Sequence, residues 1–382
     1  MGASSIAKRW RELSGENNWE GLLDPLDNDL RKYIIHYGER TQAVIDAFNG
    51  EKASKWAGFS RYSMDDFFSK VGLEISNPYK YKITKFFYAR SEIQILDWFS
   101  AGESNWMGYV AVATDEGKAV LGRRDILIAW RGTMRNLELV NDLQADLVSI
   151  EDIFGDINED SKVHHGWHSI YTAKDSESIY NKTSAREQAN EEISITLTGH
   201  SLGAAVATLS AVDIVANGYN KPTTKPDKDC LVTAFVFASP RVGDSRFKEL
   251  FSKLKNLHVL RIKDDTDVVP NLPLPLPLFQ YTHVGEELLI DTLKSPYLKN
   301  FLGIKKLMVS HQLEPYLHGV AGTQGPKGEF KLEVNRDISL VNKYLDALKD
   351  EFRVPVEWWI EKNKGMAQQD DGSWVLDDYE PN

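Results

Sequence analysis

The sequence has little cysteine, no excess of positive charge and no long hydrophobic run. Cys230 is the single cysteine among 382 residues, so no intrachain disulfide can form and a reducing, cytoplasmic location is the simpler expectation. The 45 Lys and Arg against 56 Asp and Glu give a net charge of −11, which argues against a nucleic-acid partner. No apolar stretch approaches the roughly 20 residues that span a bilayer, and residues 1–10 lack the apolar core of a signal peptide. We therefore expect a soluble cytoplasmic protein.

Three regions of the chain differ in their hydrophobic pattern. Residues 1–75 are rich in aromatic side chains at helical spacing, so we expect a helical region that packs on the core. Residues 76–359 alternate β-branched apolar runs with helical stretches, which predicts an α/β domain with a mostly parallel central sheet flanked by helices. Residues 360–382 are polar and acidic and predict a mobile C-terminal tail, in which Trp374 and Val375 indicate some docking.

The stretch 193–205 carries the strongest functional signal. It combines a buried strand, a Gly-x-Ser-x-Gly turn and a helix rich in alanine. Such a nucleophile elbow holds the serine, here Ser201, on a sharp strand-to-helix turn with its Oγ exposed above the sheet. Gly199 and Gly203 leave room where strand and helix cross, and the amides after the serine lie at a helix N-terminus, where a developing oxyanion is stabilised. We expect Ser201 to be a nucleophile; an ordinary serine in a tight turn is the alternative.

The carboxylate that such a nucleophile requires has three candidates, all after the predicted strand 257–262. A serine hydroxyl needs a general base, and the base needs an orienting carboxylate; on this kind of sheet both follow the serine in the chain. Asp267 is the favoured acid, with Asp264 and Asp265 as close rivals. Ligands gather at the carboxyl edge of open α/β sheets, where these residues are expected. For each of the three, a solvated loop acid is the alternative.

Three histidines follow these acids and are candidates for the base, namely His283, His311 and His318. His258 precedes the acids and lies within a predicted strand. A single histidine more often makes a structural hydrogen bond, and composition does not choose among the three, so all of them stay open at this point.

Seven short motifs are spread over nearly the whole chain. They are WEGLLDPL at 19–26, WRGT at 130–133, VHHGW at 163–167, GHSLG at 199–203, FASPRVG at 237–243, DVVP at 267–270 and HQLEPYLH at 311–318. Together they resemble the class 3 lipases, and most closely the cytosolic class II members of the plant phospholipase A1 branch. The resemblance implies an α/β-hydrolase fold of the class 3 lipase type with an N-terminal helical extension. It also implies a serine ester hydrolase that needs no metal and no cofactor.

The resemblance assigns roles to five residues. Ser201 matches the nucleophile, Asp267 the acid of the Asp-x-Val-Pro motif and His311 the base. Thr133 and Leu202 match the two positions whose backbone N–H groups form the oxyanion hole.

The resemblance also bears on three other histidines and on the lid. His318 remains a rival base, His283 corresponds to a structural histidine in the loop after the acid, and His200 is expected to pack under the elbow. Residues 134–143 match the position of a lid helix, with a structural helix as the alternative. Exposed apolar residues there and in the loop 272–279 are expected to make peripheral membrane contact.

The leading hypothesis for function is a phospholipase A1, which cleaves the sn-1 acyl ester of phospholipids; the sn-1 choice is implied by the resemblance alone. A lipase acting on mono- or diacylglycerol or on galactolipid by the same mechanism is one alternative. A non-catalytic signalling scaffold on the same fold is another. The sequence leaves the oligomeric state open.

Overall fold

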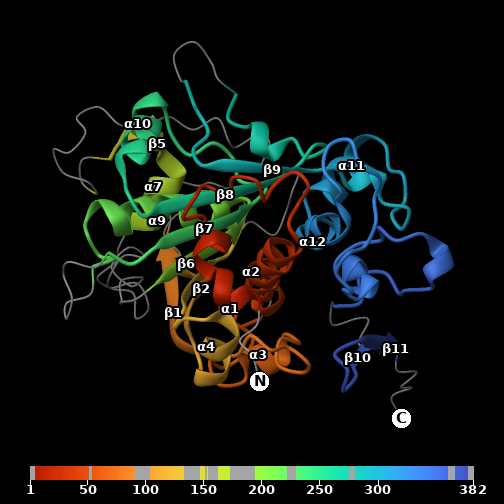
Figure 1. The fold of residues 1–382 in the computed structure, drawn as a ribbon. Helices are drawn as coiled ribbons and strands as arrows, with labels where there is room; N and C mark the ends of the chain where they lie inside the picture. The colour runs from red at the N-terminus through yellow and green to blue at the C-terminus, as the bar shows by residue number, and fades with distance from the viewer. Residues whose placement is uncertain are drawn as a thin grey trace.

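The computed structural model describes residues 5–50, 54–90, 104–132, 147–150, 153, 162–172, 194–221, 229–274, 280–359 and 366–376. At its centre is a seven-stranded sheet in the order β1-β2-β3-β6-β7-β8-β9 (Figure 1). The strands are β1 (Tyr81–Arg90), β2 (Ser104–Ala113), β3 (Ile126–Trp130), β6 (Ile195–His200), β7 (Val232–Phe237), β8 (Leu257–Asp264) and β9 (Glu286–Ile290).

The larger part of the sheet is parallel. Strands β3, β6, β7, β8 and β9 pair in parallel, whereas β1 and β2 form an antiparallel edge. Strands β6 and β7 are buried along their whole length, because helices cover both faces of the sheet, and this explains the nearly unbroken apolar run of β7. The predicted α/β fold with a mostly parallel sheet is confirmed.

Each face of the sheet has its own hydrophobic core. One face packs against α7 (His165–Thr172), α9 (Leu202–Ala216) and α10 (Ser245–Lys253). The other packs against α1 (Ser5–Leu13), α2 (Asn28–Ala47) and α12 (Leu313–Gly322). Successive strand residues alternate between the two cores, as Leu127 and Ile128 do. Among the helices of the described ranges, none combines the length and the apolar content that crossing a bilayer requires.

Shorter elements connect these layers. The shorter helices within the described ranges are α3 (Phe67–Lys70), α4 (Asp115–Leu121), α11 (Gly303–Ser310) and the 3₁₀ turns η2 (Val269–Asn271), η3 (Thr292–Lys294), η4 (Ile338–Asn342) and η5 (Asp350–Phe352). Strands β4 (Leu147–Ser149) and β5 (Lys162–His164) form a small antiparallel sheet of their own.

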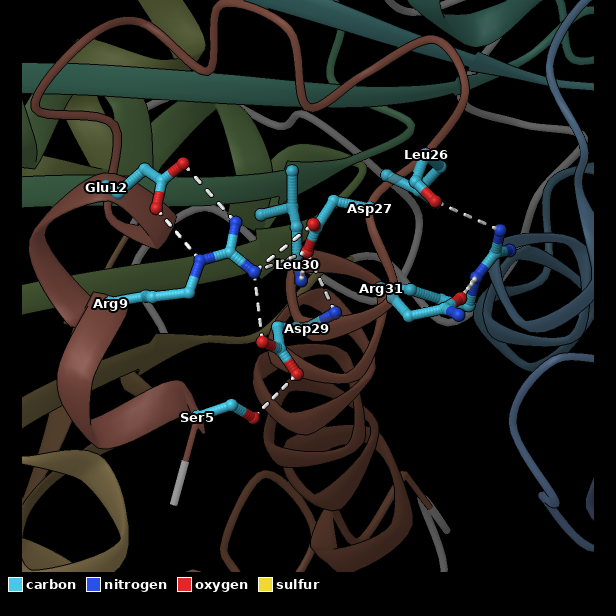
Figure 2. Close-up of polar contacts among 9 residues, drawn as sticks. Ser5, Arg9, Glu12, Leu26, Asp27, Asp29, Leu30 and Arg31 are labelled. Carbon is cyan, nitrogen blue, oxygen red and sulfur yellow. Dashed lines mark hydrogen bonds and ion pairs between the residues drawn. The ribbon is translucent and has the colours of Figure 1, made fainter. Parts of the chain in front are cut away.

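Polar contacts fix α1 against the start of α2 (Figure 2). The Arg9 guanidinium contacts the carboxylates of Asp27 at 3.2 Å and Asp29 at 3.0 Å, and that of Glu12 in its own helix at 2.9 Å. Asp27 also caps α2 by accepting from the amides of Asp29 and Leu30, which stabilises the positive end of the helix. Both helices share one core with the sheet, and the predicted domain boundary after residue 75 stays a prediction.

The C-terminal region differs from the acidic tail that the sequence predicts. Residues 366–376 form an antiparallel hairpin of β10 (Met366–Gln368) and β11 (Trp374–Leu376). The Trp374 ring lies 5.0 Å from the Trp358 ring, and the Trp374 amide donates to Asp337 Oδ2 at 2.6 Å. The polar composition predicted a tail, but Trp374 packs against distant parts of the chain, and this packing holds the segment in an ordered hairpin. Residues 360–365 and 377–382 lie outside the described residues.

Candidate active site

The turn between β6 and α9 holds Ser201 in an unusual backbone conformation. Its φ of 56° and ψ of −123° lie outside the regions that residues other than glycine adopt readily. Two glycines provide the space for this turn. A Cβ on Gly199 would lie 2.2 Å from the carbonyl oxygen of Gly203, and a Cβ on Gly203 would lie 2.6 Å from that of Trp130. The strand, sharp turn and helix that the motif predicts are all present.

Three side chains from distant parts of the sequence form one chain of hydrogen bonds. His311 Nε2 lies 2.9 Å from Ser201 Oγ, and His311 Nδ1 lies 2.7 Å from Asp267 Oδ2. The exposed fractions of Ser201, His311 and Asp267 are 0%, 2% and 1%. Ser201 follows β6 and Asp267 follows β8, so the group forms at the carboxyl edge of the parallel strands.

Two further donors hold the Asp267 carboxylate. The Tyr316 hydroxyl donates to Oδ2 at 2.7 Å, and the Val269 amide donates to Oδ1 at 3.0 Å. Burial, and next the charge of Asp267, raises the pKa of Tyr316 well above its usual value, so the phenol keeps its proton and acts as a donor. These bonds satisfy the buried carboxylate and hold it opposite His311 Nδ1. No pattern in the sequence predicted a role for Tyr316.

Helix α12 begins at Leu313, two residues after the base His311, and all of its residues are buried. Arg31 of α2 holds the other end of this helix. Its guanidinium donates to the carbonyl oxygens of Val320 at 2.5 Å and Thr323 at 2.8 Å. Figure 2 shows its further contact with the carbonyl oxygen of Leu26. A cation at a helix C-terminus satisfies carbonyl groups that have no partner within the helix. The helix that follows His311 is therefore anchored at its far end, and His311 lies in the short connection between α11 and α12.

His200 precedes the nucleophile and contacts the base. Its Nε2 lies 2.8 Å from the His311 carbonyl oxygen, which fixes Nε2 as the protonated nitrogen that donates, and the two imidazole rings are 4.8 Å apart. Burial, and next the charge on His311, lowers the pKa of His200 well below its usual value. His200 is therefore neutral. Packing under the elbow was expected, but no signal in the sequence indicated this hydrogen bond.

The two rival acids lie at the end of β8 and at the start of the loop that follows it. Asp264 Oδ1 accepts from the Thr266 amide at 2.9 Å, and its Oδ2 accepts from the Thr292 hydroxyl. Burial raises the pKa of Asp264 to about 6. Asp265 is exposed. Asp264 therefore shapes the loop that carries Asp267, and the structure does not bring either rival to the histidine beside Ser201.

The rival histidines are also held elsewhere. His318 Nε2 lies 2.8 Å from Ser295 Oγ, and its ring stacks on Phe330 at 5.0 Å. Burial, and next the charge of a nearby arginine, lowers the pKa of His318 to about 3. Burial, followed by the charge of Arg261, likewise lowers the pKa of His283 to about 3. Both side chains are neutral, and neither lies in the hydrogen-bonded chain that contains the serine.

The region expected to bind an oxyanion is described in part. Leu202 is fully buried and is the first residue of α9, so its amide lies at the positive end of that helix. The preceding loop passes close to the elbow, because a Cβ on Gly132 would lie 2.2 Å from the His200 carbonyl oxygen. Thr133 and the predicted lid at 134–143 lie outside the described residues. Within the ranges that the structure covers, no three His, Cys, Asp or Glu side chains gather so that they could hold a metal ion.

A serine, a histidine and an aspartate joined in this way at the carboxyl edge of a mostly parallel sheet define the serine hydrolases of the α/β-hydrolase type. Comparison with known proteins narrows this class. The profile of the family described as Lipase (class 3) matches residues 127–276. Phospholipase A1-IIgamma of Arabidopsis thaliana is 55% identical over 399 residues, which cover 98% of this chain and 94% of its own.

A second relative, Phospholipase A1-II 1 of Oryza sativa subsp. indica, is 50% identical over 401 residues, which cover 99% of this chain and 98% of its own. The chain belongs to the class 3 lipases, in the group of the plant phospholipases A1-II, and the resemblance seen in its motifs is confirmed. Among solved structures, nonglycosylated Yarrowia lipolytica LIP2 lipase aligns with a TM-score of 0.46 and 18% identity, over 70% of this chain and 82% of its own.

Proposed function

We propose that the protein is a phospholipase A1, a serine acylhydrolase that cleaves the sn-1 acyl ester of phospholipids. The observation that carries the proposal is the hydrogen-bonded chain from Ser201 through His311 to Asp267. The relatives that match almost the whole chain are named phospholipases A1-II, which supports both ester hydrolysis and the choice of substrate.

The first half of the reaction transfers the acyl group to the enzyme. His311 Nε2 accepts the Ser201 hydroxyl proton, at 2.9 Å in the resting structure, while Oγ attacks the ester carbonyl carbon. Asp267, 2.7 Å from Nδ1, holds the ring in the tautomer that can accept this proton and stabilises the imidazolium. The tetrahedral intermediate then collapses: the imidazolium gives its proton to the departing lysophospholipid alkoxide, and the acyl group remains on Oγ.

The second half releases the fatty acid. Water gives a proton to His311 and attacks the acyl-enzyme, and the proton returns to Ser201 as the ester bond breaks. In both halves the negative oxygen of the intermediate needs donors. We assign these to the backbone N–H groups of Leu202 and Thr133, each worth about 3 kcal/mol in the transition state by comparison with other oxyanion donors.

The test uses phosphatidylcholine with different acyl chains at sn-1 and sn-2. The wild-type protein should release the sn-1 chain, and Ser201→Ala should abolish the release. Ser210→Ala is the matched control, because Ser210 is equally buried and lies further along α9, outside the hydrogen-bonded chain. It should keep the activity.

The other outcomes separate the alternatives. Release from mono- or diacylglycerol or galactolipid, but not from phosphatidylcholine, would keep the mechanism and change the substrate. Release of the sn-2 chain would contradict the regiospecificity. No release from any of these lipids by a folded wild-type protein would favour a non-catalytic scaffold.

We also propose peripheral membrane contact through the loop after the acid. Leu274 in this loop exposes 59% of its surface, and an apolar side chain this exposed next to a lipid-hydrolysing site favours contact with lipid. Leu276, the other apolar residue that we assign to this contact, lies outside the described residues. Leu274→Asp should weaken sedimentation with phospholipid vesicles; unchanged sedimentation would count against the loop.

A cytosolic location is a further part of the proposal. The single cysteine of the chain supports it, because secreted proteins use disulfides more often. Fractionation of the cells that produce the protein would test the location, and recovery from an organelle or from the medium would contradict it.

A further inference from the structure

Exposed apolar side chains gather on α11, the helix directly before the base. Leu302, the N-cap residue of α11, exposes 88% of its surface, and Met308 in the same helix exposes 43%. Leu293 in the neighbouring turn η3 exposes 46%. Single exposed apolar residues are common on proteins, but a group of them beside a functional site indicates an interaction surface.

A small cleft connects this surface with the loops of the hydrogen-bonded site. The cleft has a volume of about 20 Å³, and its lining includes Leu293, Phe301 and Lys306 together with Thr266 and Ser310. Thr266 directly precedes the acid, and Ser310 directly precedes the base. Leu293 and Lys306 therefore share a cleft with the residues that directly precede the acid and the base.

Positively charged side chains also lie on this surface. Lys305 and Lys306 lie in α11, although the chain as a whole carries a net charge of −11. The nearby acids Asp346 and Asp350 both form ion pairs with Lys299, each at 2.6 Å. Asp346 also forms a longer ion pair with Lys305, at 4.0 Å. The lysines of α11 thus add local positive charge to an apolar surface.

We propose that Leu293, Leu302, Lys305, Lys306 and Met308 form a docking surface, called here the α11 surface, for a bilayer that contains anionic phospholipid. Apolar side chains of this kind insert at the boundary between head groups and acyl chains, while lysine ammonium groups stay at the level of the phosphates. The choice of a lipid partner rests on the proposed function. Docking at this surface brings the bilayer against the loops of Asp267 and His311, where the ester must arrive.

Vesicle sedimentation in the Ser201→Ala background tests the surface without hydrolysis of the lipid. Leu302→Asp should lower the partition coefficient about tenfold or more, because it removes one inserted leucine and adds a charge that the lipid repels. The double variant Lys305→Gln with Lys306→Gln should lower it by roughly fivefold per lysine for vesicles that contain phosphatidylglycerol, and hardly at all for pure phosphatidylcholine.

Trp56→Asp is the matched control. Trp56 exposes 57% of its surface and lies under Lys55, whose Nζ is 5.4 Å from its ring, so it offers the same chemistry. It belongs to the segment between α2 and α3, and Figure 1 places α3 at the opposite end of the molecule from α11. Each substitution is also made in the protein that retains Ser201. Hydrolysis of a water-soluble short-chain ester by these variants reports whether each one is folded.

The outcomes are distinct. Loss of vesicle binding in the α11 variants, with the control unchanged, supports the docking surface. Equal binding by wild type and Leu302→Asp, an equal loss in Trp56→Asp, or no binding by the wild type overturns it. Binding through α11 by a protein that releases no fatty acid from any phospholipid would refute the proposed function and leave the docking surface in place.

Discussion

The carboxylate beside the base is held by a phenol as well as by the imidazole. Tyr316 donates to Asp267 Oδ2 at 2.7 Å, the same oxygen that His311 Nδ1 contacts. Tyr316→Phe removes one hydrogen bond to an ionised group, worth about 1.5–3 kcal/mol. The carboxylate then orients the imidazolium less well, and we expect kcat to fall roughly tenfold or more with little change in KM. Steady-state kinetics on phosphatidylcholine measures this.

A matched tyrosine separates catalysis from stability. Tyr171 also donates to a buried carboxylate, Asp213 Oδ2, at 2.7 Å, and neither residue belongs to the hydrogen-bonded site. Tyr171→Phe should lower the free energy of unfolding by an amount similar to that of Tyr316→Phe but leave kcat unchanged. Equal kcat values for the two variants would show that the phenol of Tyr316 has only a structural role.

The end of helix α12 depends on a contact that is distant in sequence. Arg31, 1% exposed, donates from α2 to the carbonyl oxygens of Val320 and Thr323 at the end of α12. Arg31→Met leaves these buried acceptors without their cation, and we expect the free energy of unfolding to fall by about 3 kcal/mol. Urea unfolding measures it, with the exposed neighbour Lys32→Met as the control. A loss no larger than that of the control would contradict the role of Arg31.

Local motifs made some elements predictable from the sequence, whereas contacts across the chain were not. The strand, turn and helix around Ser201 follow from a contiguous pattern of apolar residues and glycines, and Asp267 could be placed because it follows an apolar strand. The hydrogen bond from His200 to the His311 carbonyl joins residues 111 positions apart. Such a contact exists only once α12 packs beside the sheet, so no spacing in the sequence encodes it.

The same limit applies to the C-terminal hairpin. Its polar and acidic composition predicted a tail. The structure instead packs Trp374 on Trp358, a contact that requires the intervening residues to return to the same place. Aromatic residues in an otherwise polar segment were the one available sign of docking.

Over the whole molecule, buried histidines make the folded state sensitive to acid. Burial lowers the pKa of His36 and His200 well below 6.5 and that of His318 to about 3. Below pH 6.5 the unfolded chain therefore binds protons that the folded chain does not. The stability from these neutral side chains is fully present above 6.5 and is lost as the pH falls. Each such proton changes the free energy of unfolding by about 1.4 kcal/mol per pH unit.

Asp264 has the opposite effect, and this gives a two-sided test. Burial raises its pKa from 3.8 to about 6, so its contribution is fully present below 3.8 and is lost as the pH rises through 6. Between about pH 4 and pH 6, His318→Gln should lower the slope of the free energy of unfolding against pH by about 1.4 kcal/mol per pH unit, the effect of one proton. Asp264→Asn should raise this slope by about the same amount. Urea unfolding across this range measures both slopes. Because the neutral histidines outnumber this one carboxylate, the wild-type protein should still become more stable as the pH rises. If the free energy of unfolding changed with pH equally in the wild type and both variants, the assignment of these two groups would be contradicted.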